Sequence, residues 1–254
     1  MPLKQSYLNG QACWAENCTD LELSKQFYST LLNWQFEEFT SGDPSVLKAT
    51  LEGRTVAALR QKKDVPSFWN LHFSVDNIEE ATKQIMDAGA RVVKNIEKLS
   101  SHGRTATFID TLGALFSIWQ KDMTAGFEEV NSFGAFCWAE LCTEDFKKSA
   151  DFYCAAMPWE ASSGAHDVMD YTVFKSNGKT LAGSMRTPQT VSNQIKSFWG
   201  VYFMVQDSDA TAKVVESLGG EILIQPMNIP EGRIAMCRDT SGSIFSVLEM
   251  ANQS

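Results

Sequence analysis

The sequence lacks clusters of lysine and arginine, and its charged residues are weighted toward the acids. Lys and Arg together number 22 against 31 Asp and Glu, which gives a net charge of −9. Proteins that bind nucleic acid or an anionic membrane surface need basic patches, because the partner carries phosphate groups. We therefore expect neither nucleic acid nor a membrane surface as a partner.

Long hydrophobic runs are also absent. A membrane-spanning helix needs about 20 consecutive apolar residues, and no stretch of the chain approaches that length. The segment Met1–Tyr7 has no apolar stretch behind its charge, so it does not resemble a secretory signal peptide. The sequence predicts a soluble protein located in the cytoplasm.

Several familiar catalytic and metal-binding motifs are missing too. The chain contains no phosphate-binding glycine loop, no GxSxG turn and no HExxH pair. Its cysteines do not form CxxC pairs, and the five-residue spacing of Cys13 and Cys18 places their thiols on opposite faces of a strand. This spacing argues against a zinc site of the CxxC type. We expect the cysteines to be reduced and mostly buried.

What the sequence does contain is an internal repeat. The segment Cys13-Trp14-Ala15-Glu16 recurs as Cys137-Trp138-Ala139-Glu140, and further matches follow in the same order. They include Phe27-Tyr28 with Phe152-Tyr153, Ser67-Phe68-Trp69 with Ser197-Phe198-Trp199, Gly103-Arg104 with Gly232-Arg233, and Asp110-Thr111 with Asp239-Thr240. The repeat predicts two tandem domains of similar structure, over residues 8–121 and 132–251.

Within each copy, hydrophobic periodicity alternates between that of a strand and that of a helix. Thr19 or Asp20 is suited to cap a first helix, and Gly89 is suited to end a second one that carries Ile78, Ala81, Ile85 and Ala88 on one face. We expect an α+β fold of four βαβββ modules that form two tandem domains with concave mixed sheets. The strands predicted for the first copy cover residues 10–18, 33–39, 45–51, 54–61, 68–75, 91–95, 104–110 and 114–120.

Three segments of the first copy resemble a known family. The segment from Trp14 to Tyr28 resembles the opening motif of the vicinal oxygen chelate superfamily, which contains glyoxalases, bleomycin-resistance proteins and extradiol dioxygenases. The segment from Phe68 to Gly89 is similar to the start of that family's second module, and Asp110 to Phe116 resembles the turn that closes it. The resemblance extends over both copies and implies a two-domain glyoxalase-like protein.

The resemblance also implies where a divalent metal would be bound. Members of the family hold Fe, Mn, Ni or Zn with His, Glu or Gln side chains from the first, fifth and eighth strands. Trp and Gly side chains cannot bind a metal ion, and neutral Ser and Asn are poor ligands. We therefore expect no cofactor, with a divalent metal as the alternative. The matching positions are Cys13 or Trp14, Asn70 and Ser117 in the first copy, and Trp138, Gly200 and Ser246 in the second.

Side chains two residues apart on a strand share a face, so Glu16 lies on the same face as Trp14, and His72 on that of Asn70. We predict that Glu16 and His72 form a catalytic acid–base pair. Two alternatives are a shifted metal site made by the same residues and a purely structural role in the core. The predicted ligand-binding residues are Trp14, Asn70, Ser117 and Trp119 in the first copy, and Trp138, Glu140, Tyr202 and Ser246 in the second.

Two repeated arginines and the remaining tryptophans have open roles at this stage. Arg104 and Arg233 could pair with Glu16 and Glu140, contact an anionic ligand, or form structural salt bridges. Trp69 and Trp199 could line an aromatic pocket together with the tryptophans already named, or pack in the core.

The leading interpretation is a protein that binds a small organic molecule in one or both concave sheets, without the usual metal site. A second hypothesis is an enzyme, namely a lyase, an isomerase or a dioxygenase, which depends either on a metal or on Glu16 and His72. A third is a protein that sequesters a drug or metabolite, as bleomycin-resistance proteins do. Tandem duplication is compatible with a monomer or a homodimer.

Overall fold

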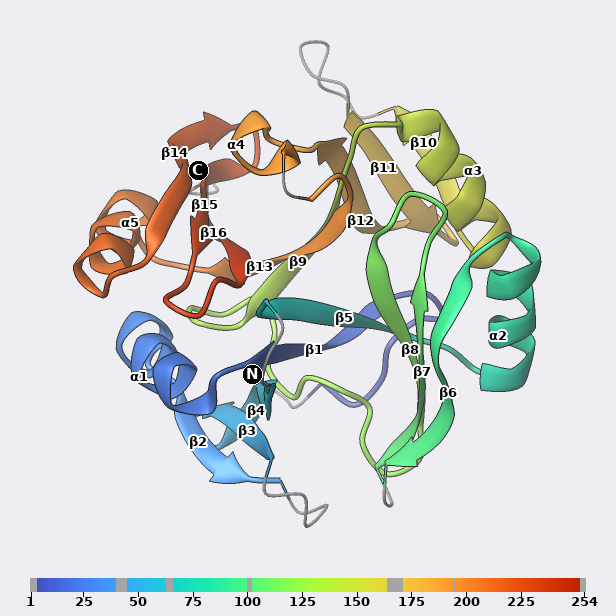
Figure 1. Cartoon of the computed structure of the whole chain (residues 1–254), viewed down its shortest axis with the longest axis horizontal. Coiled ribbons are helices and arrows are strands. Elements are labelled where there is room, and N and C mark those ends of the chain that lie inside the picture. Colours follow the sequence, from blue (N-terminus) through green and yellow to red (C-terminus); the bar gives the residue numbers. More distant parts are fainter. Residues whose placement is uncertain are drawn as a thin grey trace.

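The computed structural model of the chain describes residues 4–39, 45–62, 66–99, 102–163, 171–193 and 195–251. It contains two eight-stranded mixed sheets, one from each copy of the repeat (Figure 1). The strand orders are β2-β3-β4-β1-β5-β8-β7-β6 and β10-β11-β12-β9-β13-β16-β15-β14. The predicted α+β fold with two tandem domains and concave mixed sheets is confirmed.

The first domain follows the predicted order of elements closely. One difference is that β6 extends well beyond the expected strand at 91–95. Its register shifts between Val92 and Lys94 and again between Lys94 and Glu97, which interrupts the alternation that marks a strand in the sequence. The elements are β1 (Ala12–Thr19), α1 (Leu21–Leu32), β2 (Gln35–Glu38), β3 (Val46–Leu51), β4 (Arg54–Gln61), β5 (Phe68–Ser74), α2 (Ile78–Asp87), β6 (Arg91–Leu99), β7 (Gly103–Ile109) and β8 (Leu115–Lys121).

The second domain repeats this order and adds one short helix, α4, between its fourth and fifth strands. The elements are β9 (Phe136–Thr143), α3 (Phe146–Ala156), β10 (Glu160–Ser163), β11 (Tyr171–Ser176), β12 (Lys179–Arg186), α4 (Gln189–Ser192), β13 (Phe198–Met204), α5 (Ser208–Ser217), β14 (Glu221–Ile229), β15 (Gly232–Arg238) and β16 (Ile244–Met250).

Local sequence signals account for the helix boundaries in the first domain. Asp20 caps α1, since its carboxylate accepts a hydrogen bond from the backbone N–H of Leu23 at 3.1 Å. After α2, Gly89 has a φ of +103°, a conformation that glycine adopts without strain. Its N–H donates to the carbonyl of Met86 at 2.9 Å, which ends the helix.

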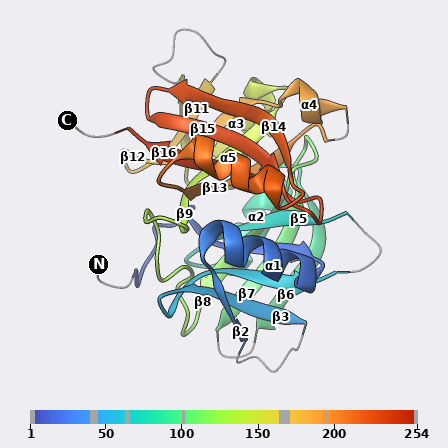
Figure 2. The same ribbon diagram turned by 90° about the vertical axis from the view of Figure 1, so that its left-hand side faces the viewer.

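The two domains pack with their convex sheet faces toward each other, so that the concave faces point away from the interface. Aromatic rings fill this interface, for example Phe73 of β5 against Trp199 of β13, with ring centroids 4.9 Å apart. Helix α1 lies beside α5 of the other domain, and α2 lies beside α3 (Figures 1 and 2). The helices therefore contribute to the contact between the domains.

No helix in the described part of the chain is long and apolar enough to cross a bilayer.

Candidate ligand-binding site

The concave face of the first sheet encloses a cavity of about 250 Å³, which we name cup 1. Its lining comes from β1, β3, β4, β5, β6 and β8 and from the segments that follow β2, β6 and β8. The lining residues are Trp14, Glu16, Phe39, Val46, Ala58, Arg60, His72, Lys98, Leu99, His102, Trp119, Thr124 and Gly126.

Strand alternation explains why the predicted site residues of the first copy come together. On β1, Trp14 and Glu16 point into cup 1, and they lie opposite His72 and Asn70 of the antiparallel neighbour β5. His72 in turn pairs with Ser117 of β8. Cys13 does not line the cavity, because its thiol is fully buried and donates to the backbone carbonyl of His72 at 3.4 Å.

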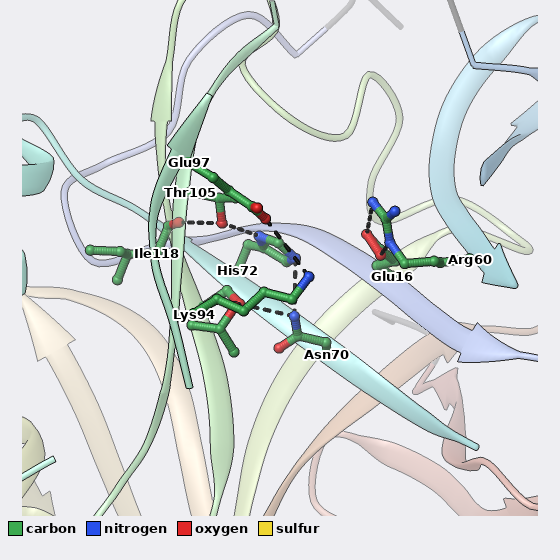
Figure 3. Close-up of polar contacts among 10 residues, drawn as sticks. Glu16, Arg60, Asn70, His72, Lys94, Glu97, Thr105 and Ile118 are labelled. Atoms are coloured by element: carbon green, nitrogen blue, oxygen red, sulfur yellow. Dashed lines mark hydrogen bonds and ion pairs between the residues drawn. The ribbon is translucent and has the colours of Figure 1, made fainter. Parts of the chain in front are cut away.

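His72 lies at the base of cup 1 within a network of neutral hydrogen-bonding groups. Its Nδ1 is 3.4 Å from the hydroxyl of Thr105, and its Nε2 is 3.3 Å from Nδ2 of Asn70. Asn70 also donates to the hydroxyl of Ser117 at 2.9 Å, and that hydroxyl is 2.8 Å from the hydroxyl of Thr107. The network fixes the orientation of the imidazole (Figure 3).

Burial lowers the pKa of His72 to about 4. The nearby cations Arg60 and Lys94 lower the pKa further, whereas Glu16 opposes the shift. The imidazole is therefore neutral at physiological pH, and one of its ring nitrogens carries a proton that can be donated.

Glu16 is paired with Arg60 of β4 and not with an arginine of the repeat motif. The guanidinium binds the carboxylate side-on, with Nε on Oε1 and with Nη2 at 3.3 Å from Oε2 (Figure 3). Arg60 shares this face because its partner on β1 is Cys18, two residues beyond Glu16. No repeated motif contains Arg60, so no sequence pattern indicated this pair.

Of the three roles considered for Arg104 and Arg233, the structure assigns salt bridges to residues other than Glu16 and Glu140. Arg104 binds Glu79 of α2 at 2.5 Å, and Arg233 binds Asp209 of α5 at 2.5 Å. Both arginines lie on the helix-covered face, since it is the next residue in β7, Thr105, that faces cup 1 and His72.

A second cation reaches cup 1 from β6, on the other side of His72 from Arg60. Lys94 and Glu97 are the register partners of Thr107 and Thr105, so they share the concave face with these threonines. The Lys94 ammonium lies 3.7 Å from the Glu97 carboxylate, and both side chains lie near His72 (Figure 3). Because the register of β6 is irregular, the periodicity of the sequence does not predict that Lys94 and Glu97 face cup 1.

The upper walls of cup 1 are aromatic. Trp14 contacts Phe39 edge-on, at 6.5 Å between ring centroids, and Phe39 contacts His102 in the same way at 4.8 Å. Trp119 is fixed by a hydrogen bond from its Nε1 to the carbonyl of Thr124 at 3.0 Å. These rings form an apolar lining above a polar base.

Trp69 and Trp199 do not take part in this wall. Their indole N–H groups donate to the hydroxyls of Tyr28 and Tyr153, at 3.1 and 2.7 Å, within the core between the two domains. Of the two roles considered for these tryptophans, the structure assigns core packing.

The centre of the concave face of the second sheet, which we name cup 2, is occupied by its own side chains. Its central carboxylate, Glu140, accepts a hydrogen bond from Tyr202, and Tyr171 and Trp138 also hydrogen-bond to it. Burial raises the pKa of Glu140, and these hydrogen bonds only partly offset that effect. Ser246 lies beside Tyr202 in the register of the sheet. The ligand-binding residues predicted for the second copy thus lie close together. Their polar groups hydrogen-bond to one another.

The register of the two sheets shows how the polar residues of cup 1 are replaced in cup 2. Apolar or aromatic side chains occupy nearly all of the corresponding positions. His72 corresponds to Tyr202, Arg60 to Met185, Val46 to Tyr171, Lys94 to Ile224, Glu97 to Met227, Thr105 to Ile234, Thr107 to Met236 and Trp119 to Leu248.

Helix α4 adds further apolar packing to cup 2. Val191 of this helix is fully buried and clusters with Cys142, Leu223, Met236 and Ile244. Cys142 and Met236 belong to the concave face, so α4 covers that part of it. Cup 1 is therefore the more open and more polar of the two concave faces.

The donor set of cup 1 does not fit the usual divalent metal. The β5 and β8 positions carry a neutral amide and a hydroxyl, Asn70 and Ser117, and these hydrogen-bond to each other. The carboxylate of Glu16 is occupied by a guanidinium. Among the residues that the structure describes, no group of three or more His, Cys, Asp or Glu side chains is placed to hold a metal ion.

Comparison with known families gives a match in each half of the chain. Residues 12–119 match the model described as a glyoxalase-like domain. Residues 135–247 match the model of the glyoxalase/bleomycin resistance protein/dioxygenase superfamily.

Individual relatives cover the whole two-domain chain. It is 30% identical over 263 residues to the protein named "Putative glyoxylase CFP32" of Mycobacterium tuberculosis, with 100% of both chains covered. It is 28% identical to the anthracycline biosynthesis protein DnrV of Streptomyces peucetius, over 95% of this chain and 94% of the relative. Among solved structures, the Mn(II)-bound glyoxalase of Novosphingobium aromaticivorans has the same fold, with a TM-score of 0.66, 13% identity and coverage of 96% and 84%.

Proposed function

This chain belongs to the glyoxalase/bleomycin resistance protein/dioxygenase superfamily, and from that premise we propose that it binds a small planar organic molecule in cup 1. The observation that carries the proposal is the open cavity of about 250 Å³ between Trp14, Phe39 and Trp119. Aromatic walls favour flat ligands, because stacked and edge-on ring contacts add to the free energy of burial.

The size of cup 1 limits the part of a ligand that it can enclose. Pockets for drug-sized molecules have volumes of about 300–1,000 Å³, so a cavity of about 250 Å³ is suited to one or two fused rings. A larger ligand would extend through the opening. The name of the relative DnrV, which refers to anthracycline biosynthesis, is in keeping with a polycyclic aromatic ligand.

We further propose that cup 2 has a structural role and that neither cup depends on a divalent metal. In cup 2, Tyr171, Tyr202 and Trp138 meet at Glu140 and occupy the space that a ligand would need. In cup 1, the strand positions that hold metal in the superfamily carry an amide and a hydroxyl that are engaged with each other.

Binding is better supported than acid–base catalysis by Glu16 and His72. The carboxylate of Glu16 is held side-on by Arg60, so both of its oxygens are already engaged by a guanidinium. The pKa of His72 is lowered to about 4, which makes the imidazole a weak base near neutral pH. The alternative of an enzyme therefore requires a ligand that displaces Arg60 or changes the surroundings of His72.

The proposal can be tested with a flat, uncharged probe, 2-methoxy-1,4-naphthoquinone, followed by quenching of tryptophan fluorescence and by calorimetry. We expect Trp14→Ala and Trp119→Ala each to weaken binding about tenfold, because each removes one wall of the pocket. The matched control is Trp138→Ala, the same substitution at the corresponding position of cup 2, which should leave the affinity unchanged. Equal affinity in all four proteins would refute the assignment of the ligand to cup 1.

The metal-free part of the proposal needs a separate measurement. Protein purified without chelator should contain substoichiometric Fe, Mn, Ni and Zn by mass spectrometry, and titration with Mn²⁺ should release no binding heat. One bound ion per chain that is lost in Glu16→Ala or His72→Ala would show that the metal-dependent alternative is correct.

A further inference from the structure

Two cationic side chains, Arg60 and Lys94, lie on the concave face on either side of the neutral imidazole of His72, and a third, Lys98, lines the wall of cup 1. Arg60 reaches the concave face from β4 and Lys94 from β6, and His72 lies between them on β5 (Figure 3). Burial lowers the pKa of His72, and the two cations lower it further. The two corresponding positions of cup 2 carry the apolar residues Met185 and Ile224.

The strongest hydrogen-bond donors near the base of cup 1 are the two cationic side chains, Arg60 and Lys94. Arg60 and Lys94 only donate hydrogen bonds, whereas the two ring nitrogens of His72 are engaged by Thr105 and Asn70. The two nearby carboxylates are held by the cations, Glu16 by Arg60 and Glu97 by Lys94 at 3.7 Å. The matching group on a ligand is an oxygen that accepts several hydrogen bonds and carries negative charge.

We propose that cup 1 selects a planar molecule with an acidic hydroxyl group, an enol or a phenol bound as its anion, whose oxygen lies beside His72 between Arg60 and Lys94. This inference rests on the proposed binding function. The positive charge that a divalent ion provides in metal-containing cups comes here from two side chains, each accompanied by its own carboxylate. The aromatic walls hold the ring, and the two cations discriminate the ionised oxygen from a neutral one.

The test uses two probes that differ in one methyl group, 2-hydroxy-1,4-naphthoquinone and its methyl ether. The hydroxyl compound is an enolate at pH 7, whereas the ether is uncharged. We expect the native protein to bind the enolate about tenfold more tightly, the ratio that corresponds to one charge-assisted hydrogen bond of about 1.4 kcal/mol. Affinities are measured by calorimetry at two salt concentrations, and the preference should shrink at the higher one.

The contributions of the two cations can be distinguished by substitutions that place the cup 2 residue at the corresponding position of cup 1. Arg60→Met should abolish most of the preference for the enolate, and Lys94→Ile should reduce it about threefold, because Lys94 is half exposed and therefore screened. Arg60→Lys, which keeps a cation beside Glu16, should retain part of the preference. The control is Arg104→Met, which removes a cation from the helix-covered face of the same domain.

The outcomes separate this inference from the proposed function. If neither naphthoquinone binds, the proposed function fails and the inference fails with it. If both bind equally tightly, or if the preference survives in both Arg60→Met and Lys94→Ile, the cup still binds planar ligands but the selection of an anionic oxygen is refuted. Because Arg60→Met leaves the Glu16 carboxylate without its cation, circular dichroism should accompany each variant, and Lys94→Ile provides the test if Arg60→Met does not fold.

Discussion

At the scale of single residues, the most informative side chain is His72. It is 4% exposed, and its ring nitrogens contact neutral groups, a threonine hydroxyl and an asparagine amide. A charged imidazole in this position would be poorly solvated, which is why burial lowers its pKa to about 4. The unfolded chain holds the same imidazole in water with a pKa of about 6.5.

This difference predicts how the stability of the fold depends on pH. Below pH 6.5 the unfolded chain takes up a proton at His72 while the folded chain does not, so the stability contributed by the neutral imidazole is complete above that pH. It is lost as the pH falls toward 4. Between pH 7.5 and pH 4.5 we expect His72 to account for a loss of about 2 kcal/mol in the free energy of unfolding.

The measurement compares urea denaturation of the native protein with that of His72→Asn at both pH values. Other groups titrate in the same range, and taking the difference between the two proteins at each pH removes their common contribution. The native protein should lose about 2 kcal/mol more than the variant on acidification. An equal loss in both proteins would mean that His72 is protonated in the folded state.

At the scale of secondary-structure elements, strands β11 and β12 determine that cup 2 is filled. Gly183 of β12 lies opposite Glu140, and a Cβ built on it would be 2.0 Å from the hydroxyl of Tyr171 and 3.0 Å from Oε1 of Glu140. The corresponding residue of the first sheet is Ala58, and Val46 stands where cup 2 has the tyrosine. Absence of one methyl group on β12 therefore provides space for the tyrosine of β11.

We predict that Gly183→Ala lowers the free energy of unfolding by about 2 kcal/mol, since the methyl group overpacks cup 2. Adding Tyr171→Val to the same chain should recover most of that loss, because it recreates the pairing of small residues seen in cup 1. The two substitutions should therefore be strongly non-additive in a double-mutant cycle of urea denaturation.

Gly200 provides the matched control for this prediction. It lies on β13, opposite Glu140, and a Cβ there would come no closer than 3.4 Å to another atom. Gly200→Ala should cost much less than Gly183→Ala and should not respond to Tyr171→Val. Additive effects of Gly183→Ala and Tyr171→Val would show that the tyrosine moves out of the cup at little cost.

Elements and fold could be predicted from the sequence because they depend on local patterns. The caps at Asp20 and Gly89 and the alternation along β1 and β5 lie within short segments, and the repeat supplies each of them twice. The placement of Trp14, Glu16 and His72 on one concave face followed from the same alternation.

The parts of the site that could not be predicted depend on contacts between distant strands. Arg60 binds Glu16 across the parallel pairing of β4 with β1, which no local pattern specifies. Lys94 reaches cup 1 only because β6 is irregular on both sides of it. The filling of cup 2 by Tyr171 likewise depends on the register of β11 against β12. The difference in polarity between cup 1 and cup 2 thus depends on how the strands pair in the folded sheets.

At the scale of the whole molecule, two equivalent hydrogen bonds join the domains. The hydroxyl of Tyr28 in the first domain donates to Asp239 of the second at 2.8 Å, and the hydroxyl of Tyr153 in the second donates to Asp110 of the first at 2.9 Å. Each aspartate also accepts from backbone N–H groups of the turn that it begins. The resemblance of Asp110 to Phe116 to the family's closing turn implied the turn at Asp110, but no local pattern predicted that these aspartates contact the other domain.

These tyrosines connect the two sheets to the aromatic core, because each hydroxyl also accepts a hydrogen bond from Trp69 or Trp199. Tyr28→Phe should therefore leave the Trp69 indole N–H without a buried partner, and the Asp239 oxygen would keep only the longer hydrogen bond from Nδ2 of Asn17 at 3.3 Å. We expect a loss of about 2–3 kcal/mol in the free energy of unfolding, and a similar loss for Tyr153→Phe.

The double variant tests whether the domains unfold as a unit. The aromatic interface remains in both variants, so we expect a single urea transition, detected at the same midpoint by tryptophan fluorescence and by circular dichroism. Its midpoint should shift by the sum of the two single effects, because the two hydrogen bonds lie at separate places in the interface and share no partner. Two separate transitions in the double variant would instead mean that each domain is stable alone and that the Tyr–Asp pairs provide most of the coupling between them.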